Sequence, residues 1–149
     1  AKGIEKMGVR SNLHLITEDL SRQRLVDVLS SDKRWKRNKQ TSILAEGLLQ
    51  YLSPEAVDDL FRQCAQIADE SMVVFTYIST RDDGNPDAGP CSGLVLWLLK
   101  RGGEPWLWSV RPEKLSSFLE ERGWRLAPEL VDTTSKYGVE FYVVAKNCQ

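Results

Sequence analysis

The chain has 149 residues, of which 28% are charged, and its formal net charge is −1. This length suits a single domain with a real hydrophobic core, and the near-neutral charge gives no general argument for binding nucleic acid or a membrane. Its three cysteines show neither metal-ligand spacing nor a paired framework, which favours a reducing, cytoplasmic setting. No apolar run approaches the ~20 residues of a membrane span, and the amino terminus lacks a signal-peptide pattern.

The amino-terminal part of the chain predicts a short strand and a helix. Residues Asn12–Ile16 have two leucines on one face, which is typical of a strand. The only histidine, His14, lies within this stretch, and a lone strand histidine without a partner is more often structural than catalytic. Ser21 can cap a helix that runs to Ser31, where apolar residues recur at helical spacing.

A basic segment, Asp32–Lys39, follows this predicted helix and contains one tryptophan, Trp35. Such a cluster could hold phosphates while the tryptophan stacks on a base. The other interpretation is a solvated loop whose tryptophan packs back on the domain. One short patch on a slightly acidic chain favours the solvated loop, so we expect no nucleic-acid partner.

The stretch Ile43–Leu52 contains the strand end on which the predicted fold and site are based. A short buried strand is predicted over Ser42–Ala45, and Glu46 directly follows its carboxyl end. Open α/β sheets bind their ligands at that edge. Gly47 permits a sharp turn or the close approach of a ligand. The alternative is an ordinary connection to the next helix with an exposed glutamate, and spacing alone does not decide between the two.

The second half of the chain alternates helices and strands. Ser53 and Pro54 form a good helix start, and Arg81–Pro90 is a loop by every local signal and suits a mobile loop on the substrate side. The predicted helices are Pro54–Ala68, Ser92–Arg101 and Pro112–Arg122, and the predicted strands are Met72–Ile78, Trp124–Val131 and Val139–Ala145.

The extended segment Glu104–Trp108 is rich in tryptophan. Its tryptophans either pack in the core and in a lid, or form an apolar wall for a substrate. Together with the loop Arg81–Pro90 and the apolar helix Ser92–Arg101, this segment is expected to cover the carboxyl edge of the sheet. The alternation of elements predicts an α/β fold whose sheet is mostly parallel and ends in a carboxyl-terminal antiparallel hairpin.

Three stretches resemble the carboxy-terminal half of the leucine carboxyl methyltransferase family, which includes polyketide O-methyltransferases. Thr17–Leu20 is similar to an Asp-Leu pair at a strand end, and Ala45–Glu55 is similar to a Glu-Gly-Leu-Leu-x-Tyr-Leu segment. The segment from Gly103–Trp106 to Gly123–Trp124 is similar to the family's terminal part. The middle match is the most specific, and together the three cover nearly the whole chain.

The resemblance implies a class I, Rossmann-like fold that transfers a methyl group from S-adenosyl-L-methionine to oxygen, often of a carboxylate. By this resemblance Asp19 and Leu20 hold the adenine end of the cofactor, and Glu46 lies beside it. The acceptor is a small molecule or another carboxylate-bearing compound, and no catalytic residue is assigned. The candidate residues on the acceptor side are Tyr51, Tyr77, Trp106 and Trp108.

The sequence departs from the family in front of Asp19. No Gly-x-Gly loop after a strand occurs among the preceding residues. We therefore expect one truncated domain over residues 1–149 that lacks the first two strands and is inactive alone. The alternative is a non-enzymatic binding or assembly module derived from a methyltransferase. Without those strands Ser42–Ala45 has an open edge, which Asn12–Ile16 or a second copy of the chain could cover. Because Asn12–Ile16 would leave the sheet ending on a short strand with little cover, we expect a homodimer through the amino-terminal third.

Overall fold

The computed structural model describes residues 11–18, 23–67, 70–128 and 139–148. Each predicted helix and strand after residue 40 is present, and all but the strand that begins at Trp124 have bounds within two residues of the prediction. The elements are α2 (Leu25–Ser31), β1 (Thr41–Ala45), the 3₁₀ turn η1 (Leu49–Tyr51), α3 (Pro54–Ile67), β2 (Ser71–Ile78), α4 (Ser92–Arg101), α5 (Pro112–Glu120), β3 (Trp124–Leu126) and β4 (Glu140–Asn147).

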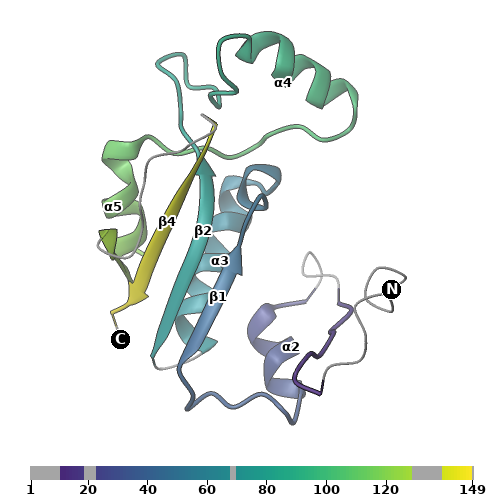
Figure 1. Cartoon of the computed structure of the whole chain (residues 1–149), viewed down its shortest axis with the longest axis vertical. Helices are drawn as coiled ribbons and strands as arrows, with labels where there is room; N and C mark the ends of the chain where they lie inside the picture. The colour runs from purple at the N-terminus through teal and green to yellow at the C-terminus, as the bar shows by residue number, and fades with distance from the viewer. Residues whose placement is uncertain (1–10, 19–22, 68–69, 129–138, 149) are drawn as a thin grey trace.

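The four strands form one open sheet in the order β1-β2-β4-β3 (Figure 1). β1 pairs with β2 in parallel, whereas β4 is antiparallel to both of its neighbours, β2 and β3. Because β3 is antiparallel to the reversed strand, it runs in the same direction as β1 and β2. The prediction of an α/β fold with a mostly parallel sheet and a carboxyl-terminal antiparallel hairpin is therefore confirmed.

The predicted strand Asn12–Ile16 is wrong, because residues 13–18 form neither helix nor strand and their side chains are exposed. This segment lies beside α2 (Figure 1), where the guanidinium of Arg34 donates a hydrogen bond to Nδ1 of His14 at 2.7 Å. Alternating leucines indicate a strand only where another strand offers hydrogen bonds and a surface to cover. Within the described residues, β1 therefore forms the edge of the sheet and pairs with β2 alone.

Two predicted elements are shorter than expected. The helix after Ser21 begins at Leu25, while residues 19–22 lie outside the described part. The strand that begins at Trp124 ends at Leu126, close to Pro128, which has no backbone N–H to give to a strand ladder. Its predicted end at Val131 also lies outside the described residues.

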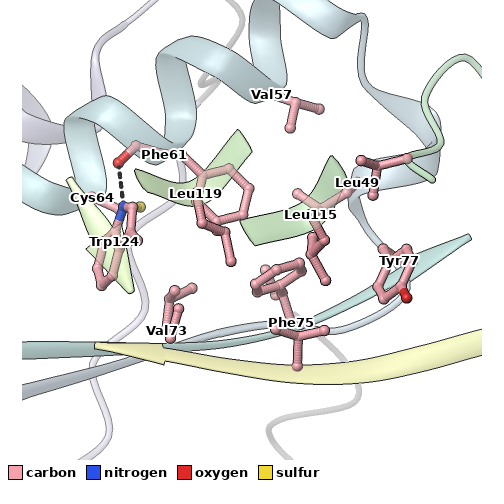
Figure 2. Packing of buried hydrophobic residues seen from close by; sticks show 14 of the residues in the cluster. Leu49, Val57, Phe61, Cys64, Val73, Phe75, Tyr77, Leu115, Leu119 and Trp124 are labelled. Carbon is pink, nitrogen blue, oxygen red and sulfur yellow. Dashed lines mark hydrogen bonds between the residues drawn. The ribbon is translucent and has the colours of Figure 1, made fainter. Parts of the chain in front are cut away.

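The hydrophobic core lies between one face of the sheet and the helices α3 and α5 (Figure 2). The ring of Phe61 on α3 meets Phe75 of β2 edge-on, with 5.1 Å between centroids, and meets Phe118 of α5 at 5.5 Å. Trp124 is fully buried, and its indole N–H donates to the carbonyl oxygen of Phe61 at 3.0 Å. Helix α3 begins as predicted, with the hydroxyl of Ser53 accepting from the N–H of Ala56.

The opposite face of the sheet has much less cover. Leu44 of β1 is 69% exposed and Tyr142 of β4 is 43% exposed. Figure 1 shows α3 behind the sheet, α5 beside β4 and no described helix in front of the sheet. The described part of the fold thus has one well-packed layer of helices and one sheet face that is largely bare near β1.

Replacing Phe75 with alanine tests this one-sided core. The ring is fully buried between α3 and the sheet, so Phe75→Ala should lower the free energy of unfolding by about 3–5 kcal/mol. Leu44→Ala, on the neighbouring strand but on the bare face, should change it by less than about 0.5 kcal/mol. Urea unfolding followed by circular dichroism measures both, and equal effects would contradict the described packing.

Candidate functional site

The carboxyl end of β1 is fixed by a hydrogen bond across the sheet. Gly47 has a positive φ of 61°, a conformation that L-residues rarely adopt. This turn directs its N–H to the hydroxyl oxygen of Thr76 on β2, at 2.8 Å, and Thr76 is fully buried. The glycine of the central stretch therefore sets the direction in which the chain leaves the sheet, directly after Glu46.

Glu46 lies at this edge with a partner that the sequence analysis did not identify. The hydroxyl of Tyr142 on β4 donates to Oε1 of Glu46 at 2.7 Å. The register places Tyr142 opposite Thr76 of β2, so the contact bridges three strands at one edge. The hydrogen bond to Glu46 and the charge of that carboxylate raise the pKa of Tyr142, because both disfavour a phenolate.

Gln50 is a second residue that the sequence analysis missed. It is 3% exposed, and its carbonyl oxygen accepts from the N–H of Leu107 at 2.6 Å and from the N–H of Trp108 at 3.3 Å. Its side-chain amide donates to Oε1 of Glu140 at 3.2 Å. Gln50 thereby joins the turn η1 to the tryptophan-rich segment and to the start of β4, all at the carboxyl edge of β1 and β2.

Two buried polar atoms at this edge lack a hydrogen-bond partner within the described part of the chain. They are Oε1 of Gln50 and Nε1 of Trp106. Buried polar atoms without partners cost free energy. No simple sequence signal marks Gln50, because its role depends on which distant segment reaches η1.

The predicted acceptor-side residues lie near the carboxyl edge but differ in exposure. Tyr77 and Trp108 belong to the core: Tyr77 is 5% exposed beside Phe141, and Trp108 is 6% exposed beside Phe118. Burial raises the pKa of Tyr77. Tyr51 is 40% exposed and Trp106 is half-buried, so these two are more accessible to a ligand.

The predicted lid segments lie beyond the carboxyl ends of β1 and β2. Figure 1 shows α4 above the sheet, with the following segment returning across its upper edge. There Ser79 pairs with Val110. The loop 81–90 has its own hydrogen bonds, among them the N–H of Asp87 to the carbonyl of Ser79 at 2.8 Å. The loop is thus tied to the end of β2.

The residues predicted to hold the adenine, Asp19 and Leu20, lie outside the described residues. The preceding Thr17 and Glu18 line an open cavity of about 590 Å³ together with Asp32 and Arg34. The hydrogen bonds of Arg34 to Asp32, together with its charge, lower the pKa of Asp32 to about 2. This cavity lies beside the carboxyl end of α2, whereas Glu46 follows the carboxyl end of β1.

Two further findings concern the described residues as a whole. They contain no group of three or more histidine, cysteine, aspartate or glutamate side chains placed to hold a metal ion. None of their helices combines the length and the apolar character that crossing a bilayer requires.

Comparison with known proteins gives a family match for the first part of the chain. The model of the leucine carboxyl methyltransferase family matches residues 3–65. This confirms the resemblance to that family over residues 3–65, which contain two of the three similar stretches, whereas the third, Gly103–Trp124, lies outside the match. The matched segment includes Asp19, Leu20 and Glu46. No curated protein sequence matches the chain.

Solved methyltransferase structures share the fold at low identity. Magnesium protoporphyrin IX methyltransferase from Synechocystis PCC 6803, with bound SAH, has a TM-score of 0.55 and 14% identity over 98% of this chain and 56% of its own. LaPhzM has a TM-score of 0.59 and 13% identity, and the match covers 98% of this chain and 38% of LaPhzM. The S-adenosylmethionine-dependent methyltransferase SibL, in its apo form, has a TM-score of 0.57 and 16% identity. The match covers 99% of this chain and 39% of SibL.

These likenesses show that the chain has a methyltransferase-like α/β fold. The chain spans between about a third and just over half of the length of the solved structures that it matches.

The contact between Tyr142 and Glu46 can be tested by titration. Glu46→Gln removes the carboxylate charge, so the raised pKa of Tyr142 should fall towards the ordinary tyrosine value. Ultraviolet absorbance at alkaline pH, with the Tyr142→Phe spectrum subtracted, isolates this residue from the other tyrosines. A raised folded-state pKa means that the contact stabilises the fold below the ordinary tyrosine pKa, and that this contribution is lost as pH rises through the raised value. An unchanged titration in Glu46→Gln would rule out the contact.

Proposed function

We propose that this chain supplies the carboxyl-terminal half of an S-adenosylmethionine-dependent O-methyltransferase of the leucine carboxyl methyltransferase type. The observation that carries the proposal is the position of Glu46. It lies within the segment that matches the family, and it directly follows β1 at the edge where open α/β sheets bind ligands. Its contact with Tyr142 fixes the carboxylate across three strands.

The residues at this edge fit a cationic sulfonium cofactor. When bound, S-adenosylmethionine would supply an activated methyl group, and transfer then depends mainly on positioning and on nearby negative charge. Glu46 provides a fixed carboxylate there. In the proposed site Asp19 accepts a hydrogen bond from the exocyclic amine of adenine, and the backbone of Leu20 adds a further contact.

We propose a small-molecule methyl acceptor, with a hydroxyl or carboxylate oxygen as the group that receives the methyl. Tyr51 and Trp106 are the most accessible of the candidate acceptor-side residues. Tyr77 and Trp108 are buried, so in the proposed site they would support Tyr51 and Trp106 by packing rather than contact the acceptor.

The described sheet supports a further part of the proposal, namely that these 149 residues do not catalyse methyl transfer by themselves. No Gly-x-Gly loop precedes Asp19 in the sequence, and the sheet face that carries Leu44 has little cover. The remaining cofactor contacts would come from a second polypeptide segment that covers this face. The first experiment therefore measures binding rather than turnover.

Calorimetric titration with S-adenosylmethionine tests the cofactor site. Asp19→Ala should weaken binding by about 1–3 kcal/mol, the usual cost of a lost hydrogen bond to a charged group. Glu46→Gln should weaken it in the same direction, because a neutral amide attracts a sulfonium less. Leu44→Ala, which lies on the bare face, is the matched control.

Each outcome of this titration has a defined meaning. If Asp19→Ala leaves the affinity unchanged, Asp19 does not belong to the site. If Glu46→Gln leaves it unchanged, Glu46 does not contact the cofactor, and the main argument for the proposal is lost. No binding to the wild-type chain at millimolar cofactor would reject a cofactor site formed by these 149 residues alone.

We also propose that two copies associate through the amino-terminal third. The N–H of Thr41 donates to the carbonyl of Glu70 at 3.0 Å, so odd-numbered residues of β1 face β2. The N–H and C=O groups of Ser42 and Leu44 therefore point towards the open edge. An apolar edge with unpaired backbone groups favours pairing with another chain, and a two-fold axis would pair the two copies of β1 antiparallel.

Light scattering at micromolar concentration tests this contact. The wild-type chain should have a mass above that of a monomer, and Leu44→Lys should reduce the assembly because edge lysines oppose strand pairing. Lys39→Leu, an exposed change just before β1, is a control that should leave the mass unchanged. A wild-type monomer, or an assembly that Leu44→Lys leaves intact, would reject pairing through β1.

A further inference from the structure

Helix α4 is an apolar helix that stands away from the core. Its only buried residue is Ser92. Leu94, Trp97 and Leu98 are 59%, 54% and 52% exposed, although they occupy positions i, i+3 and i+4 of one helix face. Large apolar side chains exposed side by side are unusual on a monomer and mark a contact surface.

The two ends of this surface carry opposite charges. At the carboxyl end of α4 are Lys100 and Arg101, and the guanidinium of Arg101 lies over the ring of Trp97 at 5.4 Å. The loop at the amino end contains Asp82 and Asp83, whose side chains are exposed and whose only described ion pairs, to Arg111 and Arg81, are long at 3.7 Å. Glu104 follows these two basic residues, but the net charge of this end remains positive.

We propose that α4 is the contact surface for a second copy of this chain, with the two helices antiparallel about a two-fold axis. A two-fold contact must be complementary to itself. Antiparallel pairing places the apolar stripe against itself and the basic end of each α4 beside the acidic loop of the other copy. Figure 1 shows that loop at the amino end of α4.

The charge of the surface supports this occupant over a membrane. Helix α4 has ten residues, a length of about 15 Å, whereas a standard interface buries ~800 Å² per partner. A contact of standard size would therefore have to include the charged loop as well as α4. An anionic lipid surface would attract Lys100 and Arg101 but repel Asp82 and Asp83, which belong to the loop at the amino end of α4.

This contact is separate from the proposed β1 edge, because α4 lies beyond the carboxyl ends of the strands (Figure 1). The experiment therefore uses the Leu44→Lys chain, in which pairing through β1 is blocked. Light scattering at micromolar concentration should still give a dimer. Adding Leu98→Lys should give a monomer, with circular dichroism unchanged since Leu98 is half-exposed.

Charge reversal separates a contact between copies from a structural role of α4. In the same background, Lys100→Glu with Arg101→Glu should also give a monomer, because two acidic ends would meet. Adding Asp82→Lys and Asp83→Lys should restore the dimer, a rescue that a change in folding would not produce. A monomeric Leu44→Lys chain, a dimer indifferent to Leu98→Lys, or the absence of rescue would each overturn the proposal. A Leu44→Lys monomer that co-sediments with vesicles of equal parts phosphatidylcholine and phosphatidylglycerol would overturn it in favour of a lipid surface.

Discussion

The packing of Phe61 against Phe75 is the interaction on which the rest of the fold depends. It joins α3 to the middle of the sheet, and the same residue contacts Phe118 of α5 and accepts the indole N–H of Trp124 through its carbonyl. Helices and strands from both halves of the chain therefore meet at one residue. Because all these contacts lie on one face, the sheet is held flat against α3 and α5, and its carboxyl edge is kept in a fixed position.

That fixed edge explains why short segments can build a site there. The turn at Gly47 is held by buried Thr76, Glu46 is held by Tyr142, and the carbonyl of Gln50 holds the segment that contains Trp106. Each contact joins residues that are distant in the sequence but adjacent across the strand ends. A carboxylate positioned in this way needs no large movement to meet a cationic ligand, which is the property that electrostatic catalysis requires.

The sequence correctly predicted elements that depend on local periodicity. It did not correctly predict features that depend on which distant segments pair with one another. The stripe of Val57, Phe61 and Cys64 marks α3 correctly, because a helix satisfies its own backbone hydrogen bonds. Asn12–Ile16 has a strand pattern but no strand beside it, so the pattern alone was insufficient. The roles of Tyr142 and Gln50 depend on register and on a long-range backbone contact, which no local pattern encodes.

The one-sided core also has an energetic consequence. Side chains such as Leu44 and Trp97 remain exposed in a fold that is otherwise well packed, and full burial of one such side chain is worth roughly 1.5–3 kcal/mol. A whole domain is stable by only ~5–15 kcal/mol, so covering a few of these side chains would change its stability substantially. Any partner that binds only the folded chain adds to its stability in proportion to the logarithm of the partner's concentration. In the proposed assemblies, burial of these exposed side chains would therefore link the stability of the fold to assembly.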